Sequence, residues 1–208
     1  MTARKIAVVS GGLSQPSSTR LLADRLAEAT VRRLTEQGIE TDVTVVELRD
    51  VARDVTNNLL AGFPSPALAD VIETVTGADG LIAVSPIFTT SYSGLFKSFF
   101  DVIDPTALDG MPVLLGATGG TERHSLALEY AMRPMFTYLH GVVVPTSVYA
   151  ASADWGSGAD TVKALPDRID RAAGEFAALV AASDRSSRVK DPFALEGDFA
   201  SIGGFQAE

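Results

Sequence analysis

The chain has 208 residues, 46% of them hydrophobic, which is about the length and composition of one α/β domain with a sizeable core. Its 17 basic and 26 acidic residues give a formal net charge of -9, which argues against nucleic-acid binding, because a nucleic-acid-binding protein needs a basic face. The chain has no cysteine and only two histidines, His124 and His140. Disulfides, thiolate catalysis, cysteine-held iron–sulfur clusters and an all-imidazole zinc site are therefore excluded, and we expect no metal.

Missing motifs exclude two further classes of protein. No apolar run approaches the roughly 20 residues that span a bilayer, and the N-terminus lacks a signal-peptide pattern, so we expect a cytoplasmic protein. A Ser-His-Asp hydrolase would carry its serine on a G-x-S-x-G turn, which is absent. If the chain is an enzyme, we therefore expect a bound organic cofactor to carry the reaction.

The first candidate site lies between an expected strand at 6–9 and an expected helix at 19–37, which Gly38 ends. First-turn amides of a helix lack internal partners, and the helix dipole favours negative charge there. Hydroxyl groups surround this helix start, on Ser10, Ser14, Ser17, Ser18 and Thr19. With Arg20 nearby, we predict a phosphate site; the alternative is a well-capped helix with a polar lead-in.

Two common nucleotide motifs do not fit this loop. A P-loop needs a lysine followed by serine or threonine after its second glycine, and a dinucleotide fingerprint needs three glycines at fixed spacing. Only Gly11 and Gly12 are present here, without such a lysine. A hydroxyl-rich loop of this kind suits a terminal phosphomonoester better than a bridging pyrophosphate.

Hydrophobic periodicity predicts that strands and helices alternate along the rest of the chain. We expect strands at 41–48, 80–85, 111–117 and 142–149, and helices at 67–75, 95–103, about 125–139 and 160–182. The segment 50–66 is expected to be irregular, the helix at about 125–139 should be bent or split at Pro134, and the last helix should break at Pro166. Because Pro145 cannot donate to a ladder, its strand should lie at a sheet edge.

Five strands that alternate with helices imply an α/β fold in which an open, five-stranded parallel sheet has helices on both faces. We expect this one domain to span residues 1–183. Ligands of such sheets bind outside the carboxyl ends of the strands. The polar loops after the first, third and fourth strands should therefore meet at one edge and form one site.

The second of these loops, 86–94, carries an aromatic residue, Phe88, among hydroxyl groups. Phe88 and Tyr92 either wall a planar heterocycle or are ordinary core aromatics beneath a loop. Ser91 and Ser93 are expected to cap the helix that follows.

The third loop has small residues, Thr118, Gly119 and Gly120, where a ring can approach the backbone closely and accept hydrogen bonds from amides. His124 either contacts the cofactor or substrate or caps the next helix. His140, beside Gly141, is expected to stabilise a helix C-terminus.

Three segments resemble the NADPH-dependent FMN reductase family of flavodoxin-like proteins, close to the flavin reductases that supply two-component flavin-dependent monooxygenases. The segments are residues 10–20 (SGGLSQPSSTR), 85–97 (SPIFTTSYSGLFK) and 117–121 (ATGGT) with His124. The resemblance covers roughly residues 5–150 and implies a flavodoxin-like three-layer sandwich that binds FMN.

In that family the first loop holds the FMN phosphate, the second wraps the ribityl chain and ring, and the third meets the pyrimidine side. The implied FMN contacts are Ser10, Ser14, Ser17, Ser18, Thr19, Pro86, Ile87, Phe88, Thr89, Thr118, Gly119, Gly120 and His124. Many members have arginine where this chain offers Ser14, so that Arg20 would supply the charge. Many also have tyrosine where Phe88 stands.

The resemblance implies hydride transfer from NADPH or NADH to FMN, with no catalytic side chain because the cofactor carries the chemistry. Arg20 or Arg123 is a candidate contact for a ribose phosphate. The implied partners are NAD(P)H and flavin as substrates, a monooxygenase that takes the reduced flavin, and further copies of the chain in a homodimer or homotetramer. The alternatives are a quinone or azo reductase, a flavodoxin-type electron carrier, and a domain that binds another phosphorylated ligand.

Residues 184–208 form an expected tail, charged at first and then rich in glycine, with three phenylalanines. We hypothesise that this tail is an arm that packs on a neighbouring subunit or over the flavin pocket. The alternative is a disordered terminus.

Overall fold

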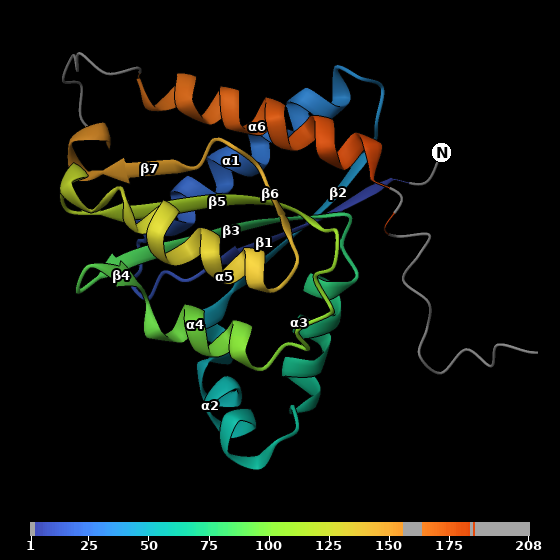
Figure 1. Cartoon of the computed structure of the whole chain (residues 1–208), viewed down its shortest axis with the longest axis vertical. Coiled ribbons are helices and arrows are strands. Elements are labelled where there is room, and N and C mark those ends of the chain that lie inside the picture. The colour runs from blue at the N-terminus through green and yellow to red at the C-terminus, as the bar shows by residue number, and fades with distance from the viewer. Residues whose placement is uncertain (1–2, 156–163, 184, 186–208) are drawn as a thin grey trace, which may run out of the picture.

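The computed structural model describes residues 3–155, 164–183 and 185. Its central sheet has the strand order β2-β1-β3-β5-β6, with every neighbouring pair parallel (Figure 1). The strands are β1 (Arg4–Ser10), β2 (Thr41–Glu47), β3 (Gly80–Phe88), β5 (Pro112–Gly119) and β6 (Val142–Val143). The predicted five-stranded parallel sheet is confirmed, and two short strands add to it.

The two additions lie at the carboxyl ends of the strands. A hairpin turns β3 back into β4 (Ser91–Tyr92), which pairs with it in antiparallel orientation. The expected single strand at 142–149 is instead two pieces, β6 and β7 (Val148–Ala151), which both pair with β5. Pro145 lies between the pieces, where it removes no ladder hydrogen bond, and this side of the sheet is an edge as predicted.

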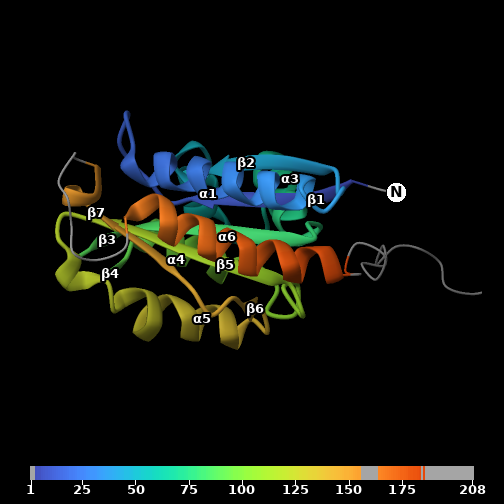
Figure 2. The same cartoon turned by 90° about the horizontal axis from the view of Figure 1, so that it is seen from above.

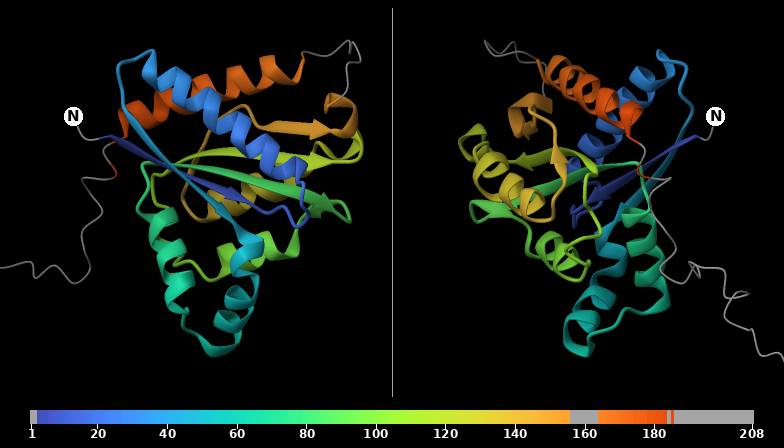
Figure 3. Two further views of the ribbon diagram at one scale, coloured as in Figure 1. Left: turned by 180° about the vertical axis from the view of Figure 1, so that it is seen from behind. Right: turned by 45° about the vertical axis from the view of Figure 1, so that its right-hand side comes forward.

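Helices cover both faces of the sheet, which gives three layers (Figure 2). The helices α1 (Ser18–Thr35) and α6 (Leu165–Ala182) lie side by side across one face, as Figure 3 shows on its left. The other face carries α2 (Ala52–Ala61), α3 (Pro66–Thr76), α4 (Gly94–Asp101) and α5 (Arg133–Tyr138).

The core consists of two apolar layers, one on each side of the sheet. Alternate residues of a strand point to opposite faces, so Ile6 and Val8 pack under α1 and α6, whereas Ala7 and Val9 pack under the other helices. The central strands β3 and β5 are buried almost throughout because helices cover them on both sides.

The prediction of an irregular segment at 50–66 is wrong. A 3-10 turn at Leu48–Val51 leads into α2, which ends at Gly62 with φ 83. The buried side chains Leu48, Val51 and Val55 recur at helical spacing and fix this segment on the core. The paired asparagines and nearby prolines are typical of turns, so the sequence of this segment predicts a loop although its apolar residues have helical spacing.

Three helical pieces replace the single helix expected at about 125–139. They are a 3-10 turn at Glu122–His124, a π-helical turn at Leu128–Met132 and α5. Pro134 lies in the first turn of α5, directly after the π-helical turn, so the segment is split there, which is one of the two predicted outcomes.

Pro166 occupies the same kind of position in α6, which begins at Leu165 and ends at the predicted Ala182. The first residues of the expected helix, 160–163, lie outside the described residues, as does nearly all of the predicted tail. His140 follows α5 in the left-handed region, with φ 58, and its Nδ1 lies 2.7 Å from a carboxylate oxygen of Asp109. In the described part of the chain, no helix is both long enough and apolar enough to cross a membrane.

Candidate functional site

A cavity of about 630 Å³ lies at the carboxyl ends of β1, β3 and β5, on the left of Figure 1. This volume is within the range of about 300 to 1,000 Å³ that small-molecule sites span. The lining residues are Gly12, Leu13, Ser14, Ser17, Ser18, Thr19, Pro86, Ile87, Phe88, Thr118, Gly119, Gly120, Ser152 and Trp155. The three loops that the sequence singled out therefore do meet in one site.

The N-terminus of α1 forms the polar end of this cavity. Ser17 is its N-cap, and the Ser17 hydroxyl accepts a hydrogen bond of 3.2 Å from the amide of Arg20. A Cβ on Gly12 would lie 2.2 Å from Ser17 Oγ, so a larger residue there would displace the hydroxyl that caps α1. No acidic residue occupies the first turn of α1, so the helix dipole and the first-turn amides other than that of Arg20 remain available to an anion.

Ser10 lies beneath this end of the cavity, at the last position of β1. Its side chain is fully buried, and its hydroxyl has no hydrogen-bond partner among the described residues. A buried hydroxyl without a partner is unfavourable, which is why such groups in native proteins are often held for a ligand.

Arg20 does not point its charge at the phosphate loop. Its guanidinium donates to Asp24 at 2.8 Å and to Glu47 at 2.7 Å, and the bond to Asp24 raises the pKa of Arg20. The cation that touches the loop is Arg49, whose Nη1 donates to the carbonyl of Ser14 at 3.4 Å. Ser10 lies beside Glu47 in the parallel ladder, and this register is what brings the residues after β2 to the loop.

A buried hydrogen bond joins the first and third loops. The hydroxyl oxygens of Thr19 and Thr118 lie 2.8 Å apart, and both side chains are buried. This bond connects the start of α1 to the end of β5 and forms the floor of the cavity.

Tyr149 supports the third loop, a role that no sequence pattern indicates. Its hydroxyl donates to the carbonyl of Thr121 at 2.8 Å, and a Cβ on Gly119 would lie 2.1 Å from that hydroxyl. Burial, with the charge of Glu122 adding to it, raises the pKa of Tyr149, so the phenol stays a donor. The small residue at 119 is therefore required by packing under the loop.

The second loop is a tight hairpin whose two aromatic residues differ. Phe88 is 48% exposed and lines the cavity, whereas Tyr92 packs on the core and its ring centroid is 6.0 Å from that of Phe96. Ser93 caps α4, as predicted, by accepting from the amide of Phe96. Ser91 does not cap it, because Ser91 pairs with Phe88 in the hairpin.

Two further residues implied as contacts, Thr89 and His124, do not line the cavity. Thr89 turns the hairpin with φ 46, next to Thr90 with φ 70. His124 ends the 3-10 turn that Thr121 caps, and it is half-buried. Neither residue is part of the cavity wall, and Ser10 is not part of it either, because its side chain is fully buried at the end of β1.

The sequence reasoning missed Leu13, Ser152 and Trp155, which also line the cavity. Ser152 and Trp155 belong to a 3-10 turn, Ser152–Trp155, directly after β7. The signal that could have found them was topological, because the loop after the fifth strand ends at the same edge as the other three.

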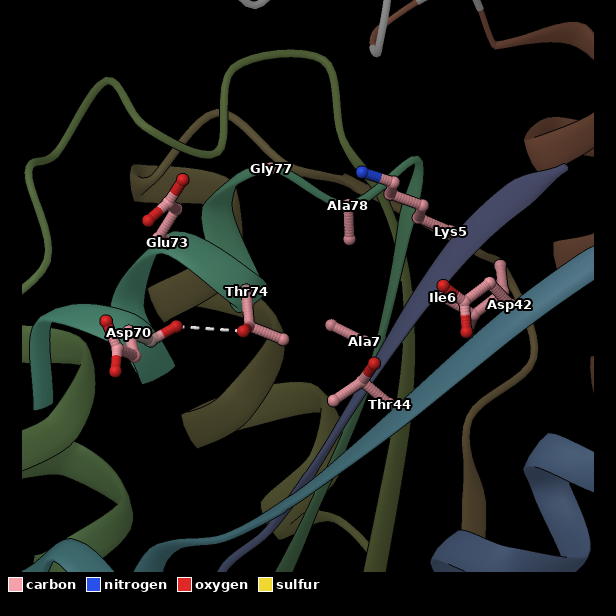
Figure 4. Close-up of a pocket in the computed structure, with 10 residues that line it drawn as sticks. All are labelled: Lys5, Ile6, Ala7, Asp42, Thr44, Asp70, Glu73, Thr74, Gly77 and Ala78. Atoms are coloured by element: carbon pink, nitrogen blue, oxygen red, sulfur yellow. Dashed lines mark hydrogen bonds between the residues drawn. The ribbon is translucent and has the colours of Figure 1, made fainter. Parts of the chain in front are cut away.

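A second hollow, of about 380 Å³, lies at the opposite end of the strands (Figure 4). The carboxylates of Asp42, Asp70 and Glu73 line it, with Lys5 as the one cation drawn there. The Thr74 hydroxyl is already used, since it donates to the carbonyl of Asp70. This acidic lining repels a phosphate, so the first cavity is the one suited to a phosphorylated ligand. Among the described residues, no three His, Cys, Asp or Glu side chains, these carboxylates included, are arranged so that they could hold a metal ion.

The residues of the first cavity fit FMN in their chemistry. A helix N-terminus with hydroxyl groups suits the phosphate, small loop residues leave room for a polar chain, and apolar side chains at the rim suit a flat ring. Gly12 lines the cavity without a side chain that could fill it, and the buried hydroxyl of Ser10 has no partner among the described residues, so both are compatible with a bound phosphate.

Comparison with known proteins gives a consistent result. The family model of NADPH-dependent FMN reductase matches residues 4–156. The chain is 38% identical to an FMN reductase (NADPH) of Pseudomonas aeruginosa and 37% identical to the NADH-dependent FMN reductase SfnF of Pseudomonas fluorescens, with 84% of this chain and 91% of each relative covered.

Solved structures agree with this. An oxidoreductase of Corynebacterium diphtheriae has a TM-score of 0.84 at 41% identity, with 88% of this chain and 100% of that chain covered. An NADH:FMN oxidoreductase, EMOB, in its apo form has a TM-score of 0.71 at 24% identity, covering 87% of this chain and 90% of its own, which supports the fold alone. The chain belongs to the NADPH-dependent FMN reductase family.

Proposed function

We propose that this protein is an NAD(P)H-dependent FMN reductase. The observation that carries the proposal is the single cavity in which a helix N-terminus with hydroxyl groups lies opposite apolar loop residues. Family membership and the two Pseudomonas relatives support the same reading.

In this proposal the phosphate binds at the N-terminus of α1. The amides of the first turn and the hydroxyl groups there donate to it, and the buried hydroxyl of Ser10 donates from below. The proposed phosphate contacts are Ser10, Ser14, Ser17, Ser18 and Thr19. Arg49 contacts the loop at Ser14, but its Nε also lies 3.1 Å from Glu47, with which Arg20 pairs too. In this proposal the amides and hydroxyls therefore hold the phosphate.

The ring lies between the second and third loops. Pro86, Ile87 and Phe88 provide an apolar wall, and the backbone at Thr118, Gly119 and Gly120 approaches the ring edge. We leave Thr89 and His124 out of the contact set because neither lines the cavity. Ser10 does not line it either, but we keep it because its buried hydroxyl has no partner among the described residues.

Bound FMN would supply the hydride acceptor for the nicotinamide of NAD(P)H. None of the described residues that line the cavity is acidic or basic, so the side chains have no proton to supply at neutral pH. The chain's part is to orient the ring through the loop backbones and to exclude water with Phe88 and Leu13.

The test is to purify the protein, add FMN, and follow the oxidation of NADPH and of NADH by absorbance under air. We expect oxidation that requires FMN with at least one of the two nucleotides. Absence of FMN-dependent oxidation with both would remove the proposal.

We further propose that the reduced flavin passes to a monooxygenase and that the protein acts in the cytoplasm, where NAD(P)H is available. We also propose a homo-oligomer: the large apolar side chains Leu59, Leu60 and Phe63 stand exposed close together at the end of α2, and a contact between copies of the chain would cover them. Light scattering measures the mass of the assembly, and a monomer at working concentration would contradict this part. Deleting the residues after Lys190 tests whether the tail takes part in it.

A further inference from the structure

The turn after β7 brings the only tryptophan of the chain to the flavin cavity. Trp155 ends the 3-10 turn Ser152–Trp155 and lines the cavity together with the third loop and the start of α1. No resemblance or motif in the sequence marked this residue, so its place in the wall is a property of the fold.

The indole ring of Trp155 is held from the side of α1. The guanidinium carbon of Arg25 lies 5.0 Å from the centre of the ring, which is a cation–π contact. The ring also packs against the core layer beneath α1 and α6, and it is only partly buried. The ring orientation is therefore set before any ligand binds.

The backbone of the turn is anchored as well. Asp154 accepts a hydrogen bond from the amide of Ala151 at 2.8 Å, and it forms an ion pair with Arg168 of α6. Arg168 also donates to the carbonyl of Tyr149, whose hydroxyl supports the third loop. One arginine thus connects the turn that carries Trp155 to the loop that faces the ring.

Such an arrangement suits a binding residue. An aromatic side chain that is already ordered loses little conformational entropy when a ligand packs against it, and it buries a large apolar area. Three apolar side chains from three different loops, Leu13, Phe88 and Trp155, then border one cavity whose inner end is polar.

We propose that Trp155 is a flavin-binding residue, which packs against the bound FMN, and that Arg25 is a positioning residue that fixes the indole. The inference rests on the proposed function, because it takes FMN as the ligand of this cavity. It adds a fourth segment, after β7, to the three loops of the site.

The experiment compares Trp155→Ala, Trp155→Phe and Arg25→Gln with the unaltered protein and with Tyr138→Ala. Tyr138 is 73% exposed and does not line the cavity, so Tyr138→Ala is the matched control for loss of an aromatic residue. The dissociation constant for FMN is measured by quenching of flavin fluorescence, the flavin absorption spectrum is recorded for each complex, and circular dichroism confirms that each variant folds.

We expect Trp155→Ala to raise the dissociation constant about tenfold, which corresponds to about 1.4 kcal/mol. Trp155→Phe should restore most of the affinity, Arg25→Gln should weaken binding by about threefold, and Tyr138→Ala should change nothing. The absorption band of bound flavin should shift in Trp155→Ala because the packed indole is gone.

Two negative results are distinguishable. If the unaltered protein binds FMN and folded Trp155→Ala binds it within about twofold, the role of Trp155 is overturned while the reductase proposal stands. If the unaltered protein does not bind FMN at all, both proposals are overturned.

Discussion

At the floor of the cavity, the hydroxyls of Thr19 and Thr118 bond to each other at 2.8 Å away from solvent. Thr19→Val removes one partner and leaves the other hydroxyl buried and unsatisfied. We expect the free energy of unfolding of the flavin-free protein to fall by about 1 to 3 kcal/mol.

The control is the double variant Thr19→Val with Thr118→Val, which leaves neither hydroxyl behind. It should lose less stability than the two single variants summed, as urea denaturation measures. Strictly additive losses would show that the two side chains do not act as a pair.

At Ser10, a substitution that weakens FMN binding should make the flavin-free protein more stable. Its hydroxyl is buried without a partner among the described residues, so Ser10→Ala removes an unfavourable group. We expect the flavin-free protein to gain about 1 kcal/mol of unfolding free energy and the complex to bind FMN less tightly. Denaturation with and without FMN measures both quantities; a variant that loses stability without FMN would contradict the assignment.

At the scale of elements, Gly80 decides how closely α6 approaches β3. A Cβ there would lie 2.7 Å from a methyl group of Val180 and 2.8 Å from the ring of Phe176. We expect Gly80→Ala to destabilise the protein by about 1 to 3 kcal/mol, because the helix must shift or its side chains must strain.

Gly94 provides the matched control for that substitution. It begins α4, and an added Cβ would meet nothing within 4 Å. Gly94→Ala should therefore leave stability unchanged or raise it by up to about 1 kcal/mol. Equal losses of thermal stability in the two variants would contradict the packing argument.

At the scale of the whole molecule, acid should loosen the layer formed by α6. Burial by itself raises the pKa of Glu175, but hydrogen bonds from the hydroxyl and amide of Thr146 and the contact with Arg171 outweigh it, so the net pKa is lowered from 4.5. The pKa of Asp170 is lowered too, by hydrogen bonds from Arg32 and Arg33 of α1.

A lowered folded-state pKa means that the unfolded chain binds the proton more readily. The stability that these carboxylates contribute is therefore complete above their ordinary pKa values and is lost as the pH falls below them. Glu175→Gln should be less stable than the unaltered protein at about pH 7, and the gap should narrow at about pH 3. A gap that stays constant with pH, by urea denaturation, would contradict this linkage.

Much of this architecture is predictable from the sequence, because strongly periodic segments such as 19–37 and 80–85 carry their own pattern of burial. The helix α2 was missed because its apolar positions begin within the preceding turn, at Leu48, and because Asn57 and Asn58 read as a loop. The strand at 142–149 was broken by Pro145, and the sequence alone does not say whether a proline interrupts a strand or only marks an edge.

The candidate site, like the fold, is predictable from the sequence only in part. Hydroxyls and glycines at strand ends could be found, because local chemistry marks them and topology brings them together. Arg20 was misplaced because the sequence does not show that Asp24 and Glu47 neutralise it. Tyr149 and Trp155 were missed as site residues because tertiary packing alone gives them their roles.

The first strand, β1, begins at the end of the sheet opposite the cavity. Arg4 opens β1, and its guanidinium donates to the carbonyl of Ala181 at the close of α6, 3.2 Å away. A tag, a carrier domain or an electrode linker fused ahead of Arg4 would therefore attach at the end of the sheet opposite the cavity, which is on the right in Figure 1. Protein immobilised in that orientation would keep the cavity facing away from the support.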